Sequence, residues 1–366
     1  MPRAHVLIEA PIEPSFRVEQ VRGLFDVPET DTIRHEWQVD LPVDDFPWQI
    51  GLIVGPSGAG KTTLARRLFP DAYFHERYDW PETKAIVDGF PAHLEGRAIM
   101  QALSSVGFSS PLHWLKRFAH LSNGQKFRCE LARLILEDAE VVICDEFTSV
   151  VDRDAARISA AAVARTLRRR GAPRFIALSC HHDVIDWLDP DWVFDCGRWA
   201  NGFARRRLRR RPAIKLCIHQ AGVADWNLFR GHHYLSSSLH GSARCFVAAW
   251  NGQPVAFTSY LHQAGVRGLK REHRTVVLPD FQGVGIGNAL SEWLGANLLR
   301  QGFRFRSVTS HPALIRQRAA RACWQLKRFG HQRRQGRQGT GQAATSSTGR
   351  LTATFEYVGQ TDKPDT

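Results

Sequence analysis

The sequence predicts an α/β protein with two domains. Its 366 residues are too many for one ordinary domain and enough for two of about 150–200 residues each. In both halves, short apolar runs typical of buried strands alternate with segments that we expect to be helical. Each half also carries one glycine-rich segment between a strand and a helix, which is the arrangement of a phosphate-binding turn.

Charge is divided unevenly along the chain. The net charge is +13, but residues 1–200 hold 23 Lys/Arg against 29 Asp/Glu, whereas residues 201–366 hold 26 against 7. The halves therefore carry −6 and +19. The basic half predicts a polyanionic partner, with a solubilising basic surface as the alternative interpretation.

Several classes of protein are disfavoured. No stretch approaches the ~18 consecutive apolar residues that a membrane span needs, and the first residues lack the apolar core of a signal peptide. The seven cysteines are scattered, odd in number and without a CxxC pair. This argues against a disulfide framework and a Cys-rich zinc site, so we expect a cytoplasmic protein.

The first glycine-rich segment predicts a nucleotide site. A strand at 49–54 leads into Gly55-Pro56-Ser57-Gly58-Ala59-Gly60-Lys61-Thr62-Thr63, and a helix from Thr62 to Leu68 follows. This is the G-x-x-x-x-G-K-[ST] pattern, in which backbone N–H groups hold a phosphate. We expect Lys61 to reach the β- and γ-phosphates of ATP and Thr62 to bind Mg²⁺.

A second apolar strand, at 141–144, ends in two carboxylates. Asp145 and Glu146 follow it directly, and a strand end beside a phosphate-binding loop is suited to a metal-binding Asp and a catalytic Glu. We expect Asp145 to hold Mg²⁺ through water and Glu146 to polarise the attacking water.

Further motifs give the first half its resemblance. A helix expected over 126–136 is preceded by Leu121-Ser122-Asn123-Gly124-Gln125. The two carboxylates are followed by Ser149-Val150-Val151-Asp152, and a strand at 175–178 is followed by His181-His182-Asp183. Over about residues 15–200 the sequence resembles the ABC-type ATPases, with Asn123 in place of a signature glycine. The resemblance implies that Ser122, Gly124 and Gln125 form the signature, Asp152 belongs to the D-loop, and His182 is the switch histidine.

The resemblance also implies a partner. In this family the signature of one chain contacts the γ-phosphate held by the other, so we expect a head-to-tail homodimer joined by two ATP molecules. Lys61 and Ser122 are only 61 residues apart in sequence, which favours a soluble member over one that docks on a membrane partner. The glutamine of the family's glutamine loop is missing; Asp88 stands in its place, as a metal-sensing residue or as part of a solvated loop. Phe16 and Phe25 are both candidates for stacking on adenine.

An arginine-rich segment separates the halves. Six of the seven residues at 205–211 are arginine, and Pro212 follows. They predict an exposed connector, either solvated or lying along a phosphate backbone. We therefore expect an ATP-binding domain at 1–203, a linker at 204–212 and a second domain at 213–360, with a flexible basic loop at 331–350.

The second half predicts a smaller mixed α/β domain. Expected strands lie at 213–218, 245–250, 254–260, 274–278, 304–309 and 352–358, and expected helices at 226–239, 288–301 and 313–327. The second glycine-rich turn is Gln282-Gly283-Val284-Gly285-Ile286-Gly287. It resembles motif A of the GNAT acyltransferases, which implies that Gln282, Gly283, Gly285 and Gly287 hold the pyrophosphate of acetyl-CoA or another acyl-CoA.

The acyl-transfer residues are less clear. Many GNAT members have, at the position of Trp324, a tyrosine that acts as the general acid and protonates the leaving thiolate. An indole cannot do this. Glu272, His273 and Tyr234 are the remaining candidates for acid–base work, with core packing favoured for Tyr234.

Three functions follow from these observations. The first is a soluble ABC-type ATPase that drives an N-acyltransferase acting on or near nucleic acid. The second is an ATP-switched clamp on nucleic acid with a degenerate GNAT fold. The third is the ATP-binding subunit of a transporter with a regulatory GNAT domain, which the short interval after Lys61 disfavours.

Overall fold

The chain forms two compact units. The computed structural model describes all residues except 1–2, 28–31, 207–210, 234–236, 332–350 and 360–366. One unit comprises Met1–Tyr78, Leu134–Val151 and Ala164–Arg211, and the other comprises Asp79–Arg133, Asp152–Val163 and Pro212–Thr366. Both units are discontinuous in sequence. The domain boundaries expected at 203 and 212 stay predictions.

The first unit is built on a six-stranded sheet in the order β4-β5-β6-β3-β7-β8. All neighbouring strands are parallel except the antiparallel pair β7–β8. Their bounds are β3 Ile50–Val54, β4 Tyr73–His75, β5 Val141–Cys144, β6 Arg174–Ser179, β7 Trp192–Asp195 and β8 Phe203–Arg205. The strands predicted at 49–54, 141–144 and 175–178 are confirmed.

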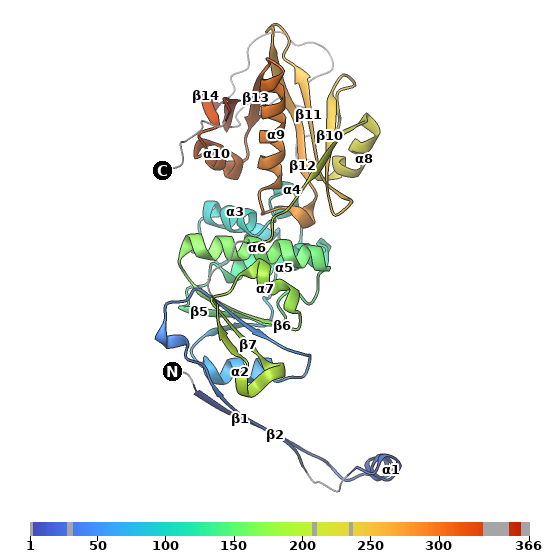
Figure 1. The fold of residues 1–366 in the computed structure, drawn as a ribbon, viewed down its shortest axis with the longest axis vertical. Helices are drawn as coiled ribbons and strands as arrows, with labels where there is room; N and C mark the ends of the chain where they lie inside the picture. The colour runs from blue at the N-terminus through green and yellow to red at the C-terminus, as the bar shows by residue number, and fades with distance from the viewer. Residues whose placement is uncertain (1–2, 28–31, 207–210, 234–236, 332–350, 360–366) are drawn as a thin grey trace. The chain divides into compact units, whose positions relative to one another are not determined.

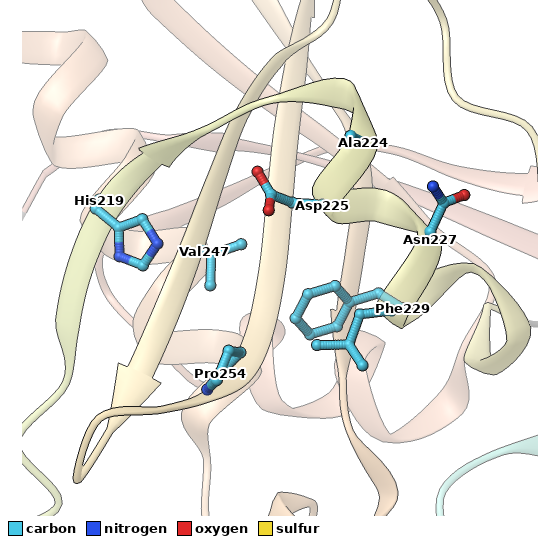
Figure 2. A pocket seen from close by; sticks show the side chains of 8 residues that line it. His219, Ala224, Asp225, Asn227, Phe229, Val247 and Pro254 are labelled. Carbon is cyan, nitrogen blue, oxygen red and sulfur yellow. The ribbon is translucent and has the colours of Figure 1, made fainter.

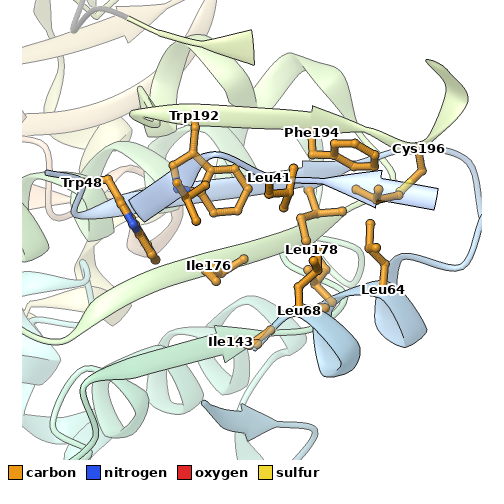
Figure 3. Close-up of a cluster of buried hydrophobic side chains, with 14 residues drawn as sticks. Leu41, Trp48, Leu64, Leu68, Ile143, Ile176, Leu178, Trp192, Phe194 and Cys196 are labelled. Carbon is orange, nitrogen blue, oxygen red and sulfur yellow. The ribbon is translucent and has the colours of Figure 1, made fainter. Parts of the chain in front are cut away.

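A buried apolar cluster fixes helix α2 (Lys61–Leu68) against this sheet. Leu64 and Leu68 of α2 pack with Ile143 of β5 and with Ile176 and Leu178 of β6 (Figure 3). Burying a leucine side chain stabilises a fold by about 1.5–3 kcal/mol. Because α2 begins directly after the glycine-rich turn, this cluster also fixes the turn at the end of β3.

An antiparallel ribbon extends from the first unit. Strands β1 (Arg3–Pro11) and β2 (Thr32–Asp40) pair along their whole length. Between them lies helix α1 (Phe16–Phe25), which Ser15 caps by accepting a hydrogen bond from the N–H of Val18 (3.3 Å). Figure 1 shows α1 at the far end of the ribbon, well away from α2.

The second unit contains a helical segment that precedes the first unit's carboxylate strand in sequence. Its helices are α3 Gly96–Ser105, α4 Pro111–Trp114 and α5 Asn123–Leu134, and α6 (Arg153–Arg170) continues from this unit into the other. Trp80 donates to Glu130 of α5 (2.6 Å) and stacks on Phe118, which ties the loop before α3 to α5. The helix predicted at 126–136 is confirmed as α5 and begins three residues earlier.

The second unit also contains a seven-stranded sheet in the order β14-β15-β13-β12-β11-β10-β9. Its only parallel pair among the described residues is β12–β13. The strands are β9 Cys217–Ala221, β10 Arg244–Trp250, β11 Gln253–His262, β12 Leu269–Val277, β13 Arg304–Thr309, β14 Trp324–His331 and β15 Leu351–Tyr357. Helix α9 (Ile286–Arg300) packs across β11, β12, β13 and β15 (Figure 1). The predicted α/β class is confirmed in both units.

Three predicted elements of the second half differ from the structure. The strand expected from 213 begins at Cys217. The helix expected at 226–239 is broken into α8 (Trp226–Phe229) and a 3₁₀ turn at Arg230–His232; it would have continued through residues 234–236, which lie outside the described part. The helix expected at 313–327 is wrong beyond Ala319, because α10 (Pro312–Ala319) ends there and β14 begins at Trp324.

Within the described part of the chain, no helix is both long and apolar enough to cross a membrane.

Candidate ATP and diphosphate sites

The first glycine-rich turn has the backbone geometry that a phosphate-binding loop requires. Gly58 and Gly60 have φ of 78° and 76°, values that side-chain-bearing residues rarely adopt. Gly55 lies so close to Cys196 that a Cβ on it would be 2.9 Å from the Cys196 Cβ. The turn also carries Ser57, and α2 begins with Lys61, Thr62 and Thr63.

Lys61 and Thr62 make different contacts: Lys61 bonds to the glycine-rich turn, and Thr62 bonds to Asp145. The Lys61 amine donates to the carbonyl oxygens of Gly55 (2.9 Å) and Pro56 (2.8 Å), so it lies over its own loop. The Thr62 hydroxyl donates to Asp145 Oδ2 (2.7 Å), which joins the start of α2 to the end of β5. The two expected Mg²⁺ ligands are thus adjacent, and a hydroxyl beside a carboxylate is a donor set suited to Mg²⁺.

Glu146 stands at a constrained turn beside Asp145. Its φ is 48°, and its N–H donates to Asp145 Oδ1 (2.8 Å). The Ser149 hydroxyl donates to the Glu146 carbonyl (2.8 Å), closing the turn behind it. The Glu146 side chain is exposed, and its role in orienting water stays a prediction.

The signature segment forms a helix cap. The N–H of Gln125 donates to Ser122 Oγ (3.3 Å), and the N–H of Ser122 donates to Gln125 Oε1 (3.2 Å), which is a reciprocal capping box at the start of α5. Ser122 and Asn123 are exposed, and Gly124 is partly so. Asn123 lies inside the right-handed helix, so its replacement of the family's glycine requires no unusual backbone conformation. This end of α5 therefore presents polar groups with the positive end of the helix dipole.

The second glycine-rich turn likewise opens a helix. Gly283 and Gly285 have φ of 89° and 97°, and Gly285 is the N-cap of α9. Gly287 lies in the first turn of α9, where a Cβ would be 3.2 Å from a methyl of Val277. The N-cap of this fifteen-residue helix makes no side-chain cap hydrogen bond, and a helix start preceded by a turn with positive φ is an arrangement suited to a diphosphate.

Gln282 is held by two backbone groups. Its Nε2 donates to the carbonyl of Val277 (2.9 Å), and its Oε1 accepts from the N–H of Ser109 (3.1 Å). The Gln282 side chain is therefore engaged in holding the turn, and the ligand-binding role expected for it stays a prediction.

Known proteins match parts of the chain. A tylosin resistance ATP-binding protein of Streptomyces fradiae is 35% identical over 115 residues, which are 27% of this chain and 21% of that protein. A zinc transport system ATP-binding protein of Treponema pallidum is 26% identical over 185 residues, 40% of this chain and 66% of that protein. The chain thus spans about a fifth and about two thirds of these relatives, and no protein-family profile matches it.

The relatives support an ABC-type ATPase domain.

Two solved structures overlap with different parts of the chain. A dimeric ATP-binding cassette bound to ADP and phosphate covers 46% of this chain and 89% of its own length, with 10% identity and a TM-score of 0.36. An acetyltransferase of the GNAT family from Desulfovibrio desulfuricans covers 39% and 98%, with 14% identity and a TM-score of 0.31. These TM-scores are too low to support an argument, so the description of the fold depends on the strand order and pairing of this chain alone.

The remaining predicted residues of the ABC-type ATPase domain are placed as follows. His182 is exposed at the start of a short 3₁₀ turn, with Nε2 3.4 Å from Asp195 Oδ2 at the end of β7. Asp152 caps α6 by accepting from the N–H of Ala155 (2.9 Å). Asp88 is exposed on the 3₁₀ turn Ile86–Gly89. Their roles stay predictions.

Neither adenine-stacking candidate lies near the ATP-binding turn. Phe16 and Phe25 are 78% and 75% exposed on α1, at the far end of the ribbon in Figure 1. The structure therefore does not place either phenylalanine where an adenine on this turn would lie.

In the second unit, the parallel strands β12 and β13 separate after three paired residues. Leu269–Arg271 pair with Arg304–Arg306, and the rest of each strand is unpaired with the other. The GNAT resemblance implies that an acyl group enters such a gap. Here it is occupied by an ion pair: Arg318 Nη2 lies 3.2 Å from Glu272 Oε2, with the two side chains 3% and 9% exposed.

Hydroxyl groups complete this buried pair. Ser307 and Thr275 donate to Glu272, and Arg318 donates to Ser307 and Ser291. Burial acts to raise the pKa of Glu272, but Arg318 and the hydroxyl donors outweigh it, so the pKa lies below its ordinary value. Glu272 is thus a paired carboxylate and is not free to act as a general base.

The other acyl-transfer candidates are also constrained. Burial, with the neighbouring cations Arg274 and Arg271, lowers the pKa of His273 to about 4, and its Nε2 accepts from the N–H of His240 (3.2 Å). Trp324 is on β14 and not on a helix as predicted; its indole donates to Glu292 (3.3 Å). Tyr234 lies outside the described residues.

A pocket of about 330 Å³ lies elsewhere in the second unit, between β9, α8 and the β10–β11 hairpin (Figure 2). His219, Asp225 and Asn227 line it together with apolar side chains. Because Asp225 already accepts from the N–H of Gly222 (2.7 Å), its carboxylate holds its own turn. We assign the pocket no function.

Sequence reasoning missed three residues around the second turn: Arg128, Asp280 and Ser109. Nothing in their local sequence pattern indicates a partner, because each contacts a segment more than 150 residues away.

Proposed function

We propose that the chain is an ATP-hydrolysing enzyme of the ABC type that acts as a head-to-tail homodimer. The observation that carries the proposal is the Thr62–Asp145 hydrogen bond, because it places both Mg²⁺ ligands at the start of the phosphate-binding helix with Glu146 next in sequence. ATP would lie on the turn with Lys61 at its β- and γ-phosphates and Mg²⁺ held by Thr62 and Asp145. When bound, Mg²⁺ neutralises charge on the phosphates.

The signature of a second copy would complete the site. Ser122 and the exposed start of α5 offer a hydroxyl and backbone N–H groups to a γ-phosphate, which the first copy holds from one side only. ATP then joins the two copies, and hydrolysis separates them.

The test is Glu146→Gln, which keeps the shape of the side chain but removes the base. The variant is expected to lose ATPase activity and to form a stable dimer in ATP and Mg²⁺, measured by light scattering. Glu13→Gln makes the same change at another exposed site and should stay active. A Glu146→Gln variant that stays monomeric with saturating ATP would contradict the proposal.

For the second unit we propose that the turn at Gln282–Gly287 binds the diphosphate of coenzyme A. The positive φ at Gly283 and Gly285 and the helix that begins directly after them support this. The reaction that we propose for this unit is acyl transfer to an amine, with neither Glu272 nor His273 as its general base, because both are engaged in other contacts. Acetyl-CoA and CoA should raise the melting temperature, and Gly285→Glu should abolish the shift by placing a carboxylate where the diphosphate binds. No shift with either compound would refute it.

A nucleic acid is the second candidate partner of this unit. Edge strand β14 exposes Lys327 and Arg328 beside Phe329, and cations next to an exposed ring are typical of surfaces that bind single strands. Binding to a single-stranded oligonucleotide should weaken with salt and in Lys327→Ala/Arg328→Ala. An affinity that these two substitutions leave unchanged would exclude this surface.

The zinc-transport relative favours a third possibility, an ATP-binding subunit of a transporter. Recovery with membranes after cell fractionation would support it, and recovery only in the soluble fraction would oppose it.

A further inference from the structure

Arg128 joins the signature helix to the second glycine-rich turn. It lies six residues after Ser122 on α5, about 9 Å along the helix axis, and its side chain is only 1% exposed. Its Nη1 lies 3.2 Å from Asp280 Oδ1, and its Nη2 donates to the Asp280 carbonyl (3.0 Å). Asp280 belongs to the 3₁₀ turn Pro279–Phe281, immediately before Gln282.

The burial of this guanidinium makes the contact specific. Burial lowers the pKa of Arg128, while the charges of Asp280 and, more weakly, Asp152 act in the opposite direction. A nearly inaccessible cation is stable only if its carboxylate partner stays in place. Asp152 is the residue predicted for the D-loop. Arg128 therefore interacts electrostatically with a residue of the predicted D-loop and with Asp280, which precedes the glycine-rich turn.

A second contact approaches the turn from the segment after α3. The N–H of Ser109 donates to Gln282 Oε1 (3.1 Å). The backbones of Gly107 and Gly283 touch: a Cβ on Gly283 would lie 2.7 Å from Gly107 Cα, and a Cβ on Gly107 would lie 2.6 Å from the Gln282 carbonyl oxygen. Neither position can carry a side chain without moving the other segment.

The Arg128–Asp280 pair limits how far the turn can move relative to α5, and the Ser109 and Gly107 contacts limit how far it can move relative to the segment after α3. A diphosphate ligand requires one arrangement of the turn's N–H groups, and a γ-phosphate requires one position of the start of α5. A shift of α5 by a fraction of an ångström would change the Arg128–Asp280 geometry and, through Gln282, the turn.

We infer that Arg128 is a positioning residue that couples nucleotide binding at the signature end of α5 to diphosphate binding at the Gln282–Gly287 turn. The inference rests on the proposed function, because it needs both ligands. Coupling of this kind is reciprocal: ATP changes the affinity for CoA by the same factor by which CoA changes the affinity for ATP. Typical factors are about 5- to 150-fold.

The experiment measures CoA binding by calorimetry to the full chain carrying Glu146→Gln, with and without ATP and Mg²⁺. ATP should change the CoA Kd by at least about fivefold. Arg128→Lys, which keeps the charge but loses the two-point contact, should reduce that change to less than about twofold. Arg133→Lys is the matched control, because Arg133 lies on the same helix and donates to the Gly89 carbonyl (2.9 Å) and should keep the full effect.

A second variant guards against misfolding of the first. Asp280 is 47% exposed, so Asp280→Asn should fold, and it should also reduce the ATP effect. Equal ATP effects in the Arg128→Lys, Asp280→Asn and Arg133→Lys variants would overturn the coupling. So would binding of both ligands to the parent with no mutual effect. Failure of ATP or CoA to bind when tested alone would refute the proposed function itself, and the coupling with it.

Discussion

Replacing Arg318 with methionine should destabilise the sheet of the second unit by a predictable amount. Arg318 is 3% exposed and contacts Glu272, Ser307 and Ser291, while its guanidinium lies 4.6 Å from the ring centre of Trp324. Methionine fills similar volume but removes the cation. Glu272, 9% exposed, then keeps its charge with hydroxyl donors alone. Removing one member of a buried ion pair costs about 3–5 kcal/mol, so we expect a loss in that range at pH 7.

The assay is native-state hydrogen exchange by mass spectrometry, which reports the free energy of local opening without assuming that the two units unfold together. Peptides covering β12 and β13 should lose about 3–5 kcal/mol of protection in Arg318→Met. Arg316→Met, an exposed neighbour on α10, is the control and should change protection by less than about 0.5 kcal/mol.

The pH dependence tests the cause. In the native chain the pKa of Glu272 is depressed, so its contribution to stability is present above the unfolded pKa and is lost as the pH falls below it. Without Arg318, burial dominates and raises that pKa, so the variant is penalised most at high pH. The difference in opening free energy between the native chain and Arg318→Met should therefore become smaller as the pH falls from 7 towards 4. A loss below about 1 kcal/mol, or a difference independent of pH, would refute the reasoning.

Three other substitutions test local features. Ser122→Ala removes the capping hydroxyl and should cost about 1 kcal/mol, seen as roughly fivefold faster exchange at the start of α5, whereas Ser122→Thr should not. Because burial and neighbouring cations lower the pKa of His273 to about 4, the native state resists its protonation, and stability should fall as the pH drops from 6.5 towards 4. The ring is partly exposed and its charge is screened by water, so we expect a loss of roughly 1–2 kcal/mol, and the melting temperature of His273→Gln should depend less on pH over this range. Gly283→Ala, which places a methyl group against Gly107, should lower the melting temperature, whereas Gly96→Ala, with open space around it, should not.

The ATP site could be predicted from sequence because each of its parts is local. The turn from Gly55 to Thr63 and the carboxylates at 145–146 depend on residues adjacent in the chain, and the parallel sheet brings them together without further information. The turn between the strands expected at 245–250 and 254–260 is also local: it consists of Asn251-Gly252, a typical hairpin-turn pair, and both residues have positive φ.

The second unit was harder to predict because distant segments decide its local structure. Residues 313–327 are rich in helix-forming residues and contain no proline or glycine, so local propensity favours one helix. The segment from Trp324 instead pairs with β15, which begins at Leu351, and the buried Trp324 packs against Phe305 and Tyr357. Strand pairing across more than twenty residues outweighs helix propensity and is not visible in the local pattern.

The distant contacts also change what the motifs mean together. The signature (121–125) and the second glycine-rich turn (282–287), which the motif order assigns to separate domains, belong to one compact unit, while the first glycine-rich turn belongs to the other. A ligand can shift a conformational equilibrium only if it binds two states with different affinity. Arg128 contacts Asp280, and the Gly107 backbone contacts Gly283. A state in which α5 moves relative to the turn must therefore break a buried ion pair, and one in which the segment after α3 moves must separate two touching backbones. We infer that ATP and a diphosphate ligand would select among the same states of this unit. The sharing of one unit, more than the presence of either motif alone, would then let ATP binding affect the second glycine-rich turn.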